Sequence, residues 1–219
     1  MIITAIDGSP KPKDSNTGAF INAVIKQLEG NPIIHTYAVA KTVVNEEAMD
    51  EIMQSDILLL GFPLYVDGIP VNMLKQLIAL EHAYRKREHA DVIVYVIVNN
   101  GFYEGEQNVN AIEMVKHFCK RAGIRFGQGV GIGTGEMQGQ MIRQGMPVGK
   151  AVLTNLGRES EVLVKHIAEK KSGPNLYVRP NFPWHGFQLM GDQTFWKPQA
   201  KKNGLSVKDL NRRMEYKRG

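Results

Sequence analysis

Short apolar runs alternate with segments of helical periodicity along most of the chain. Continuous apolar runs predict strands that are covered on both faces. Five such segments are found, at residues 2–6, 32–37, 56–62, 91–98 and 124–133. The intervening segments predict helices, one beginning after residue 15 and the others over residues 46–54, 70–80, 107–122 and 148–169. Strands that alternate with helices predict a doubly wound parallel sheet with helices on both faces.

The composition is that of an ordinary globular protein. The chain has 219 residues, of which 43% are hydrophobic and 22% charged, enough to bury a core in one α/β domain. No apolar run approaches the roughly 18 residues that a membrane helix needs. The single cysteine, Cys119, excludes an intrachain disulfide, and the six histidines show no metal-ligand spacing, so we expect no metal. With no leader-like N-terminus, these features predict a cytoplasmic protein.

The C-terminal segment differs in charge and texture from the rest. Residues 174–219 hold nine Lys or Arg against three Asp or Glu, a net +6, whereas residues 1–173 hold 18 against 19, a net −1. The segment also carries Trp184, Phe187, Phe195 and Trp196. We therefore predict a main domain over residues 1–173 and a basic, aromatic-rich arm over residues 174–219 that is not an independent domain. A neutral main domain argues against a nucleic-acid partner.

The turn after the first predicted strand has the composition of a phosphate site. Gly8-Ser9-Pro10-Lys11 ends the strand, and Ser15-Asn16-Thr17 opens the following helix. The first backbone N–H groups of a helix are unpaired and its dipole favours an anion there, while hydroxyl groups add further donors. An ordinary turn with Ser15 as helix N-cap would explain the same residues. On this segment alone, both interpretations stay open.

Two further loops follow the third and fourth strands. Leu64, Tyr65 and Val66 stand between Pro63 and Pro70, where apolar side chains need a covering surface, either a flat aromatic ligand, another subunit or the arm. Gly68 permits a sharp turn in this loop. The amides in the Asn99-Asn100-Gly101 loop can read the edge of a heterocycle, although Asn-Gly is also a plain turn signal.

The three loops together describe one ligand, because the carboxyl ends of parallel strands meet at one edge of the sheet. One loop suits a phosphate, one the face of an aromatic ring and one a polar ring edge, which together match flavin mononucleotide (FMN). A dinucleotide fits less well, since the first turn lacks G-x-G-x-x-G. The glycines of residues 129–135 have the wrong spacing for that motif. We interpret them as places of close backbone approach within or beside the sheet.

These loops resemble those of the flavodoxin-like NAD(P)H-dependent oxidoreductases, the NADPH-dependent FMN reductase and quinone reductase group. The resemblance implies a flavodoxin-like three-layer α/β sandwich, with a five-stranded parallel sheet in the order 2-1-3-4-5 and a C-terminal extension. It implies a homodimer or homotetramer. Pro12 is an extra residue in the phosphate loop relative to this group.

The resemblance also implies a set of FMN-binding residues. The phosphate would be held by Ser9, Lys11, Ser15, Asn16 and Thr17. The isoalloxazine ring would be lined by Pro63, Leu64, Tyr65, Val66 and Asp67, and its far edge would meet Asn99, Asn100, Gly101 and Phe102.

The implied activity is transfer of a hydride from NADH or NADPH through bound FMN to a small oxidised acceptor, such as a quinone, an azo compound or free flavin. Because the cofactor carries the redox chemistry, we nominate no catalytic residue. One alternative is a flavodoxin-type electron carrier without its own small-molecule substrate, although flavodoxins tend to be shorter and acidic. Another is a binding or scaffold protein that keeps the fold without redox work.

Overall fold

The computed structural model describes residues 1–11, 13–87 and 90–213. They fall into two compact units, one over Met1–Asn181 and one that begins at Phe182. Pro12, the extra proline of the predicted phosphate loop, lies outside the described residues.

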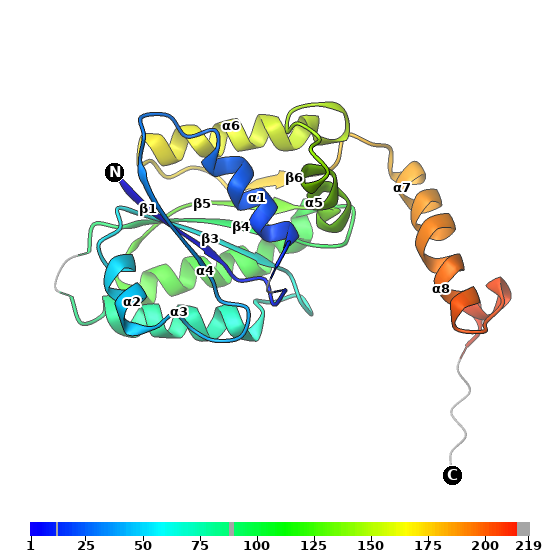
Figure 1. The fold of residues 1–219 in the computed structure, drawn as a ribbon, viewed down its shortest axis with the longest axis horizontal. Coiled ribbons are helices and arrows are strands. Elements are labelled where there is room, and N and C mark those ends of the chain that lie inside the picture. Colours follow the sequence, from blue (N-terminus) through cyan, green and yellow to red (C-terminus); the bar gives the residue numbers. More distant parts are fainter. Residues whose placement is uncertain (12, 88–89, 214–219) are drawn as a thin grey trace, which may run out of the picture. The chain divides into compact units, whose positions relative to one another are not determined.

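A parallel six-stranded sheet in the order β2-β1-β3-β4-β5-β6 runs through the first unit (Figure 1). Its strands are β1 Ile2–Asp7, β2 Ile33–Ala38, β3 Ile57–Pro63, β4 Ile93–Asn99, β5 Arg125–Ile132 and β6 Leu176–Val178. The prediction of five strands in the order 2-1-3-4-5 is therefore wrong by one strand, since β6 pairs with β5 at the edge. Only three residues long and lying between Pro174 and Pro180, β6 shows no hydrophobic period of its own. It lies in the segment that the sequence assigned to the arm.

Helices cover both faces of this sheet (Figure 1). One face carries α1 Asn16–Ile25, α5 Gly135–Arg143 and α6 Thr154–Ala168, and the other carries α2 Glu46–Ile52, α3 Val71–Tyr84 and α4 Val109–Ala122. Alternate residues of the central strands enter two separate cores: Leu58 and Leu60 pack on the side of α3 and α4, and Leu59 on the side of α1 and α6. Since both faces of β3 and β4 are buried, their apolar runs are continuous rather than alternating.

Two elements of the first unit depart from the sequence prediction. The long helix predicted over residues 148–169 begins only at Thr154, after a short 3-10 turn, η2, over Ala151–Leu153. Helix α5 was not predicted, because glycines at its first position and in its middle weaken the helical pattern. Gly139 is required by packing, since a Cβ there would lie 2.5 Å from the Cβ of Asn16. The close approach of α5 to α1 thus depends on a residue that lowers helix propensity.

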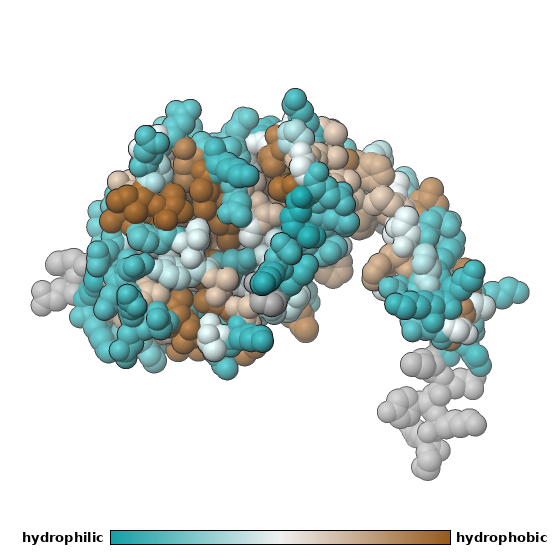
Figure 2. Space-filling view, in the orientation of Figure 1, coloured by the Kyte–Doolittle hydropathy of each residue, from teal (hydrophilic) through white to brown (hydrophobic). Residues whose placement is uncertain are grey.

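The sequence predicts an extended arm followed by a short helix around residues 207–213, but the second unit is already helical from Trp184. It contains α7 Trp184–Gly191, the π-helical turn η3 Asp192–Trp196, α8 Lys197–Lys202 and the 3-10 turn η4 Val207–Asn211. Apolar residues lie among polar ones on its surface (Figure 2), with Trp184, Leu189, Phe195 and Trp196 exposed. Across residues 1–11, 13–87 and 90–213, we find no helix with both the length and the apolar composition that crossing a membrane requires.

Candidate functional site

The loops after β1, β3 and β4 come together where the strand order reverses. The chain runs from β1 outward to β2 and then returns to β3 on the other side of β1, which places a crevice between the loops that follow β1 and β3. A cavity of about 180 Å³ lies there. Ten of the fourteen predicted binding residues line it: Ser9, Lys11, Asn16, Thr17, Pro63, Leu64, Tyr65, Asn99, Asn100 and Gly101.

The other four predicted residues are not part of this lining. Ser15 lines a second cavity, which shares Lys11 with this one. Val66 and Asp67, in the loop after β3, and Phe102, in the loop after β4, are exposed to solvent. The side chain of Val66 is fully exposed. Glu136, on α5, lines the cavity although the sequence did not point to it, because α5 itself was not predicted.

At the β1–α1 turn, two of the three predicted hydroxyl donors are engaged with protein groups. Ser15 is the N-cap of α1: its Oγ accepts a hydrogen bond from the Gly18 N–H at 2.7 Å and donates to Asp7 Oδ2 at 2.5 Å. The N-cap interpretation of Ser15 is thus confirmed. The buried Thr17 hydroxyl donates to Asn99 Oδ1 at 2.8 Å, which ties α1 to the end of β4.

The donors that remain at this end of the cavity come from few groups. Ser9 Oγ accepts from the Lys11 N–H at 3.2 Å, which leaves the Ser9 hydrogen available. Lys11 also lines the cavity, and the backbone N–H groups of Asn16 and Thr17 have no acceptor within α1. This end of the cavity therefore combines a cation with a helix N-terminus, an arrangement that favours an anion.

The Asn16 side chain joins α1 to α5. Its Nδ2 donates to Glu136 Oε2 at 2.8 Å, and its Oδ1 accepts from Arg143 Nε at 3.1 Å. Both polar atoms of this side chain are thus used in the protein. Asn16 contributes to the wall of the cavity mainly by holding α5 in place.

Asn100, on the loop after β4, also lines the cavity and carries a buried acceptor without a partner. The residue is only 4% exposed, and its Nδ2 donates to the Glu104 carbonyl oxygen at 3.1 Å. Among the described residues, Asn100 Oδ1 has no hydrogen-bond partner. A buried acceptor without a partner is costly, so it marks a place where a ligand N–H would be stabilised.

The loop after β3 ends in a tight turn next to the cavity. Tyr65 and Gly68 exchange two backbone hydrogen bonds, and Val66 and Asp67 between them have φ values of 48° and 56°. Two consecutive positive φ values define a type I′ turn, which favours Asn and Gly. The unusual backbone thus belongs to Val66 and Asp67, whereas Gly68 does not have a positive φ. A β-branched residue in this conformation is strained.

Replacing Val66 with asparagine is expected to raise the free energy of unfolding of the ligand-free protein by about 1 kcal/mol, because asparagine tolerates positive φ. Urea unfolding followed by circular dichroism measures the effect. The control is Val43→Asn, which changes another exposed valine without a positive φ. If Val66→Asn proves no more stable than Val43→Asn, the turn is not strained.

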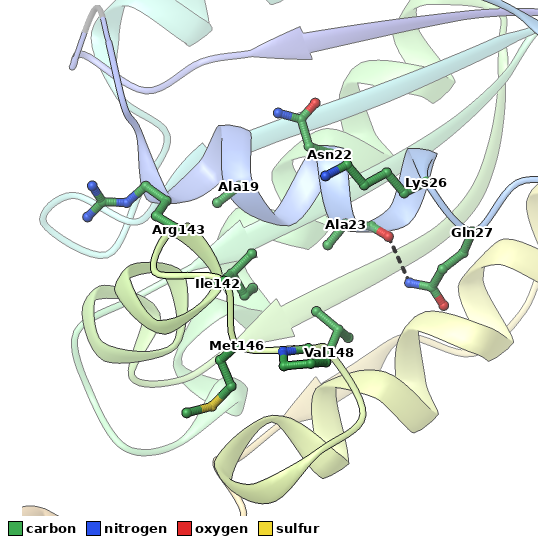
Figure 3. Close-up of a pocket in the computed structure, with 11 residues that line it drawn as sticks. Ala19, Asn22, Ala23, Lys26, Gln27, Ile142, Arg143, Met146 and Val148 are labelled. Carbon is green, nitrogen blue, oxygen red and sulfur yellow. Dashed lines mark hydrogen bonds between the residues drawn. The ribbon is translucent and has the colours of Figure 1, made fainter.

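Two further hollows lie on the α1 side of the loop. One, of about 290 Å³, is lined by Asp7, Lys11, Lys13, Asp14, Ser15, Gly18, Ala19, Asn22 and Arg143. The other is a groove of about 600 Å³ in which Asn22, Ala23 and Lys26 of α1 face the segment around residues 142–148 (Figure 3). The groove shares no residue with the 180 Å³ cavity, so the predicted ring loops do not reach it.

Electrostatics single out one carboxyl group near the site. Burial raises the pKa of Asp7, while hydrogen bonds from Ser15 and Ser9 act in the opposite direction. Cys119 is far more deeply buried in the α4 core, and burial raises the pKa of its thiol to about 12. Within the part of the chain that the structure describes, no three His, Cys, Asp or Glu side chains form a group able to hold a metal ion.

The sheet order and the position of the cavity define an α/β protein of the flavodoxin-like fold, with β6 added at the edge. No protein-family model and no curated protein sequence matches the chain. Solved structures do match. EmoB, an NADH:FMN oxidoreductase in its apo form, aligns with 78% of this chain and 90% of its own at a TM-score of 0.57 and 13% identity.

A second solved structure, described as an NADPH-quinone reductase from P. pentosaceus, aligns with 77% of this chain and 98% of its own. Its TM-score is 0.51 and its sequence identity 15%. Both similar structures are oxidoreductases by description. At this identity, the likeness establishes the fold.

Proposed function

We propose that the protein is an FMN-dependent oxidoreductase that takes a hydride from NADH or NADPH and passes it to a small oxidised acceptor, such as a quinone, an azo compound or free flavin. The observation that carries the proposal is the pairing of two unlike ends in one cavity. One end combines Lys11 with the N-terminus of α1, and the other holds the buried, unpartnered Oδ1 of Asn100.

FMN fits both ends by its chemistry. Its phosphate would be held by the Lys11 ammonium group and by the free N–H groups of Asn16 and Thr17. A ring N–H at the far edge of the isoalloxazine would satisfy Asn100 Oδ1. Leu64 and Tyr65, which line the cavity between these ends, would cover the ring with apolar and aromatic surface.

Bound FMN supplies the hydride chemistry, and the protein binds and orients it. Asn100 is held for this role, because its Nδ2 donates to the Glu104 carbonyl and its Oδ1 is thereby fixed. The Thr17–Asn99 hydrogen bond sets the spacing between the phosphate end and the ring end. Tyr65 is 53% exposed, which leaves the ring side of the cavity open for donor and acceptor to bind in turn, as a ping-pong reaction requires.

We further propose that the protein is a homodimer or homotetramer. Val71, Leu74 and Ile78 form an exposed apolar stripe along α3, at the spacing of one helix face. The stripe directly follows the loop that carries Tyr65 and Val66. A second subunit packed there would cover apolar surface close to the flavin.

Anaerobic mixing with NADH or NADPH tests the proposed reaction. The FMN-loaded protein is expected to lose its flavin absorbance on addition of the nicotinamide nucleotide and to regain it when a quinone is added. The readout is the visible spectrum before and after each addition. Protein that binds FMN but is reduced by neither nucleotide would instead be an electron carrier, and protein that takes up no flavin would contradict the proposal altogether.

A further inference from the structure

Asp7, the last residue of β1, lies behind the loop to which we assign the flavin phosphate. Its Oδ1 accepts a hydrogen bond from the Ser9 N–H at 2.9 Å, and its Oδ2 accepts from the Ser15 hydroxyl at 2.5 Å. Ser9 and Ser15 are both residues that the sequence predicted as phosphate donors. The carboxylate of Asp7 therefore engages one donor of a residue that lines the phosphate cavity, the Ser9 N–H, and places a negative charge behind the phosphate loop.

The charged groups around Asp7 do not neutralise it directly. The 290 Å³ cavity onto which Asp7 opens is also lined by Lys11, Lys13 and Asp14 of the loop and by Arg143 of α5. No ion pair between Asp7 and a cation is found among the described residues, and Arg143 Nε donates to Asn16. Glu136, also on α5, adds a second negative charge on the far side of Asn16. The charge of the Asp7 carboxylate is thus stabilised by hydrogen bonds from two uncharged donors, the Ser9 N–H and the Ser15 hydroxyl.

We propose that Asp7 couples binding of the flavin phosphate to the uptake of one proton, and thereby sets how strongly the protein prefers FMN over riboflavin at a given pH. The inference rests on the proposed function. While Asp7 is ionised, the Ser15 hydrogen points to it and its charge repels the phosphate. Once Asp7 takes a proton from solvent, its own O–H donates to Ser15 Oγ. The repulsion between the Asp7 carboxylate and the phosphate is then removed.

Ser15 Oγ can support this exchange. It already accepts from the Gly18 N–H, and a hydroxyl oxygen has a second lone pair for the protonated carboxyl group. The N-cap of α1 is therefore kept in both states. Only the direction of one hydrogen bond changes, and the loop loses one negative charge.

The sign of the pH dependence follows from linkage. Burial already places the pKa of Asp7 above its ordinary value of 3.8 in the free protein, and a bound phosphate would raise it further. Between these two pKa values, the Kd for FMN is expected to fall by up to about tenfold for each unit by which the pH is lowered. The phosphate itself loses a charge below its second pKa of about 6, which weakens binding and limits the gain at lower pH.

Titration of the full chain with FMN and with riboflavin, over a series of pH values, measures the effect through flavin fluorescence. Calorimetry in buffers of different ionisation enthalpy counts the protons taken up. Between the two pKa values of Asp7, the wild type is expected to take up close to one proton more with FMN than Asp7→Asn does, and none with riboflavin. Comparison with Asp7→Asn subtracts any proton that the phosphate itself binds or releases.

Asp7→Asn reproduces the protonated state permanently. Its Oδ1 can still accept from the Ser9 N–H, and its Nδ2 can donate to Ser15 Oγ. We expect this variant to bind FMN about tenfold more tightly than the wild type above the Asp7 pKa, with no proton uptake at this position and unchanged riboflavin affinity. Asp14→Asn is the matched control, because it removes the same charge from the same cavity at a φ of 51° that asparagine accepts. It is expected to change the FMN affinity by less than about twofold.

Two results would overturn the inference, and they differ. If FMN and riboflavin both bind, but the FMN preference and its pH dependence are the same in the wild type and in Asp7→Asn, the coupling is absent and the proposed function stands. If neither flavin binds at any pH, the proposed function fails together with the inference.

Discussion

Replacement of Gly133 with valine is expected to lower the free energy of unfolding by about 3 kcal/mol. A Cβ at Gly133 would lie 2.2 Å from the carbonyl oxygen of Tyr103 and 2.8 Å from the carbonyl carbon of Glu104. Both are backbone atoms, so no side chain can rotate away. The loop after β4 would have to move from β5, and Asn100 would move with it. Urea unfolding followed by circular dichroism measures the loss.

Gly101→Ala is the control for this prediction, since a Cβ at Gly101 meets no atom within 4 Å. Its free energy of unfolding is expected to stay within about 0.5 kcal/mol of the wild type. If Gly133→Val is as stable as Gly101→Ala, the loop after β4 does not pack closely against the end of β5, and the structure is wrong there. The contact at Gly133 confirms the interpretation of the glycine-rich segment as a place of close backbone approach.

Asn100→Ala is expected to weaken FMN binding by about 10- to 100-fold, which corresponds to about 1–3 kcal/mol for one buried hydrogen bond. The stability of the ligand-free protein should change much less. The variant loses the bond from Nδ2 to the Glu104 carbonyl, but it also removes the unpartnered Oδ1. Fluorescence titration gives the Kd, and urea unfolding of the ligand-free protein gives the stability.

Asn108 offers a matched control for Asn100. It is also fully buried with an unpartnered Oδ1, and its Nδ2 donates to the Gly105 carbonyl at 2.9 Å, but it does not line the cavity. Asn108→Ala should therefore change the stability about as much as Asn100→Ala does, but leave the flavin Kd within about twofold of the wild type. Equal losses of flavin affinity in both variants would show that the Oδ1 of Asn100 has no special role.

Much of the fold was predictable because the central strands are apolar on both faces. The runs at residues 56–62 and 91–98 correspond to β3 and β4, and Gly123 ends α4 with a φ of 70°, as expected of a helix C-cap. Once the strands are parallel, topology places the loops after β1, β3 and β4 at one edge. That argument needs no side-chain detail, and it brought residues as distant as Ser9 and Asn100 to one cavity.

Side-chain direction could not be predicted in the same way. Ser15 has the residue type of a phosphate donor and of a helix N-cap, and only the position of Asp7 decides that its hydrogen is engaged within the protein. Glu136 was not predicted as a site residue because α5 was not predicted. Helix α5 contains Gly139, which its close packing against Asn16 requires but which weakens the helical pattern. At Gly139, the low helix propensity of glycine argues against a helix, whereas the packing of α5 on α1 requires glycine. A prediction from one sequence sees only the propensity.

The most direct measurement is a crystal structure of the protein grown with FMN. We expect electron density for the phosphate at the N-terminus of α1, beside Lys11, and for the ring between Tyr65 and Asn100. Asn100 Oδ1 should then lie within hydrogen-bond distance of a ring N–H. Density for FMN at another place, or none at a concentration that saturates binding in solution, would contradict the site described here.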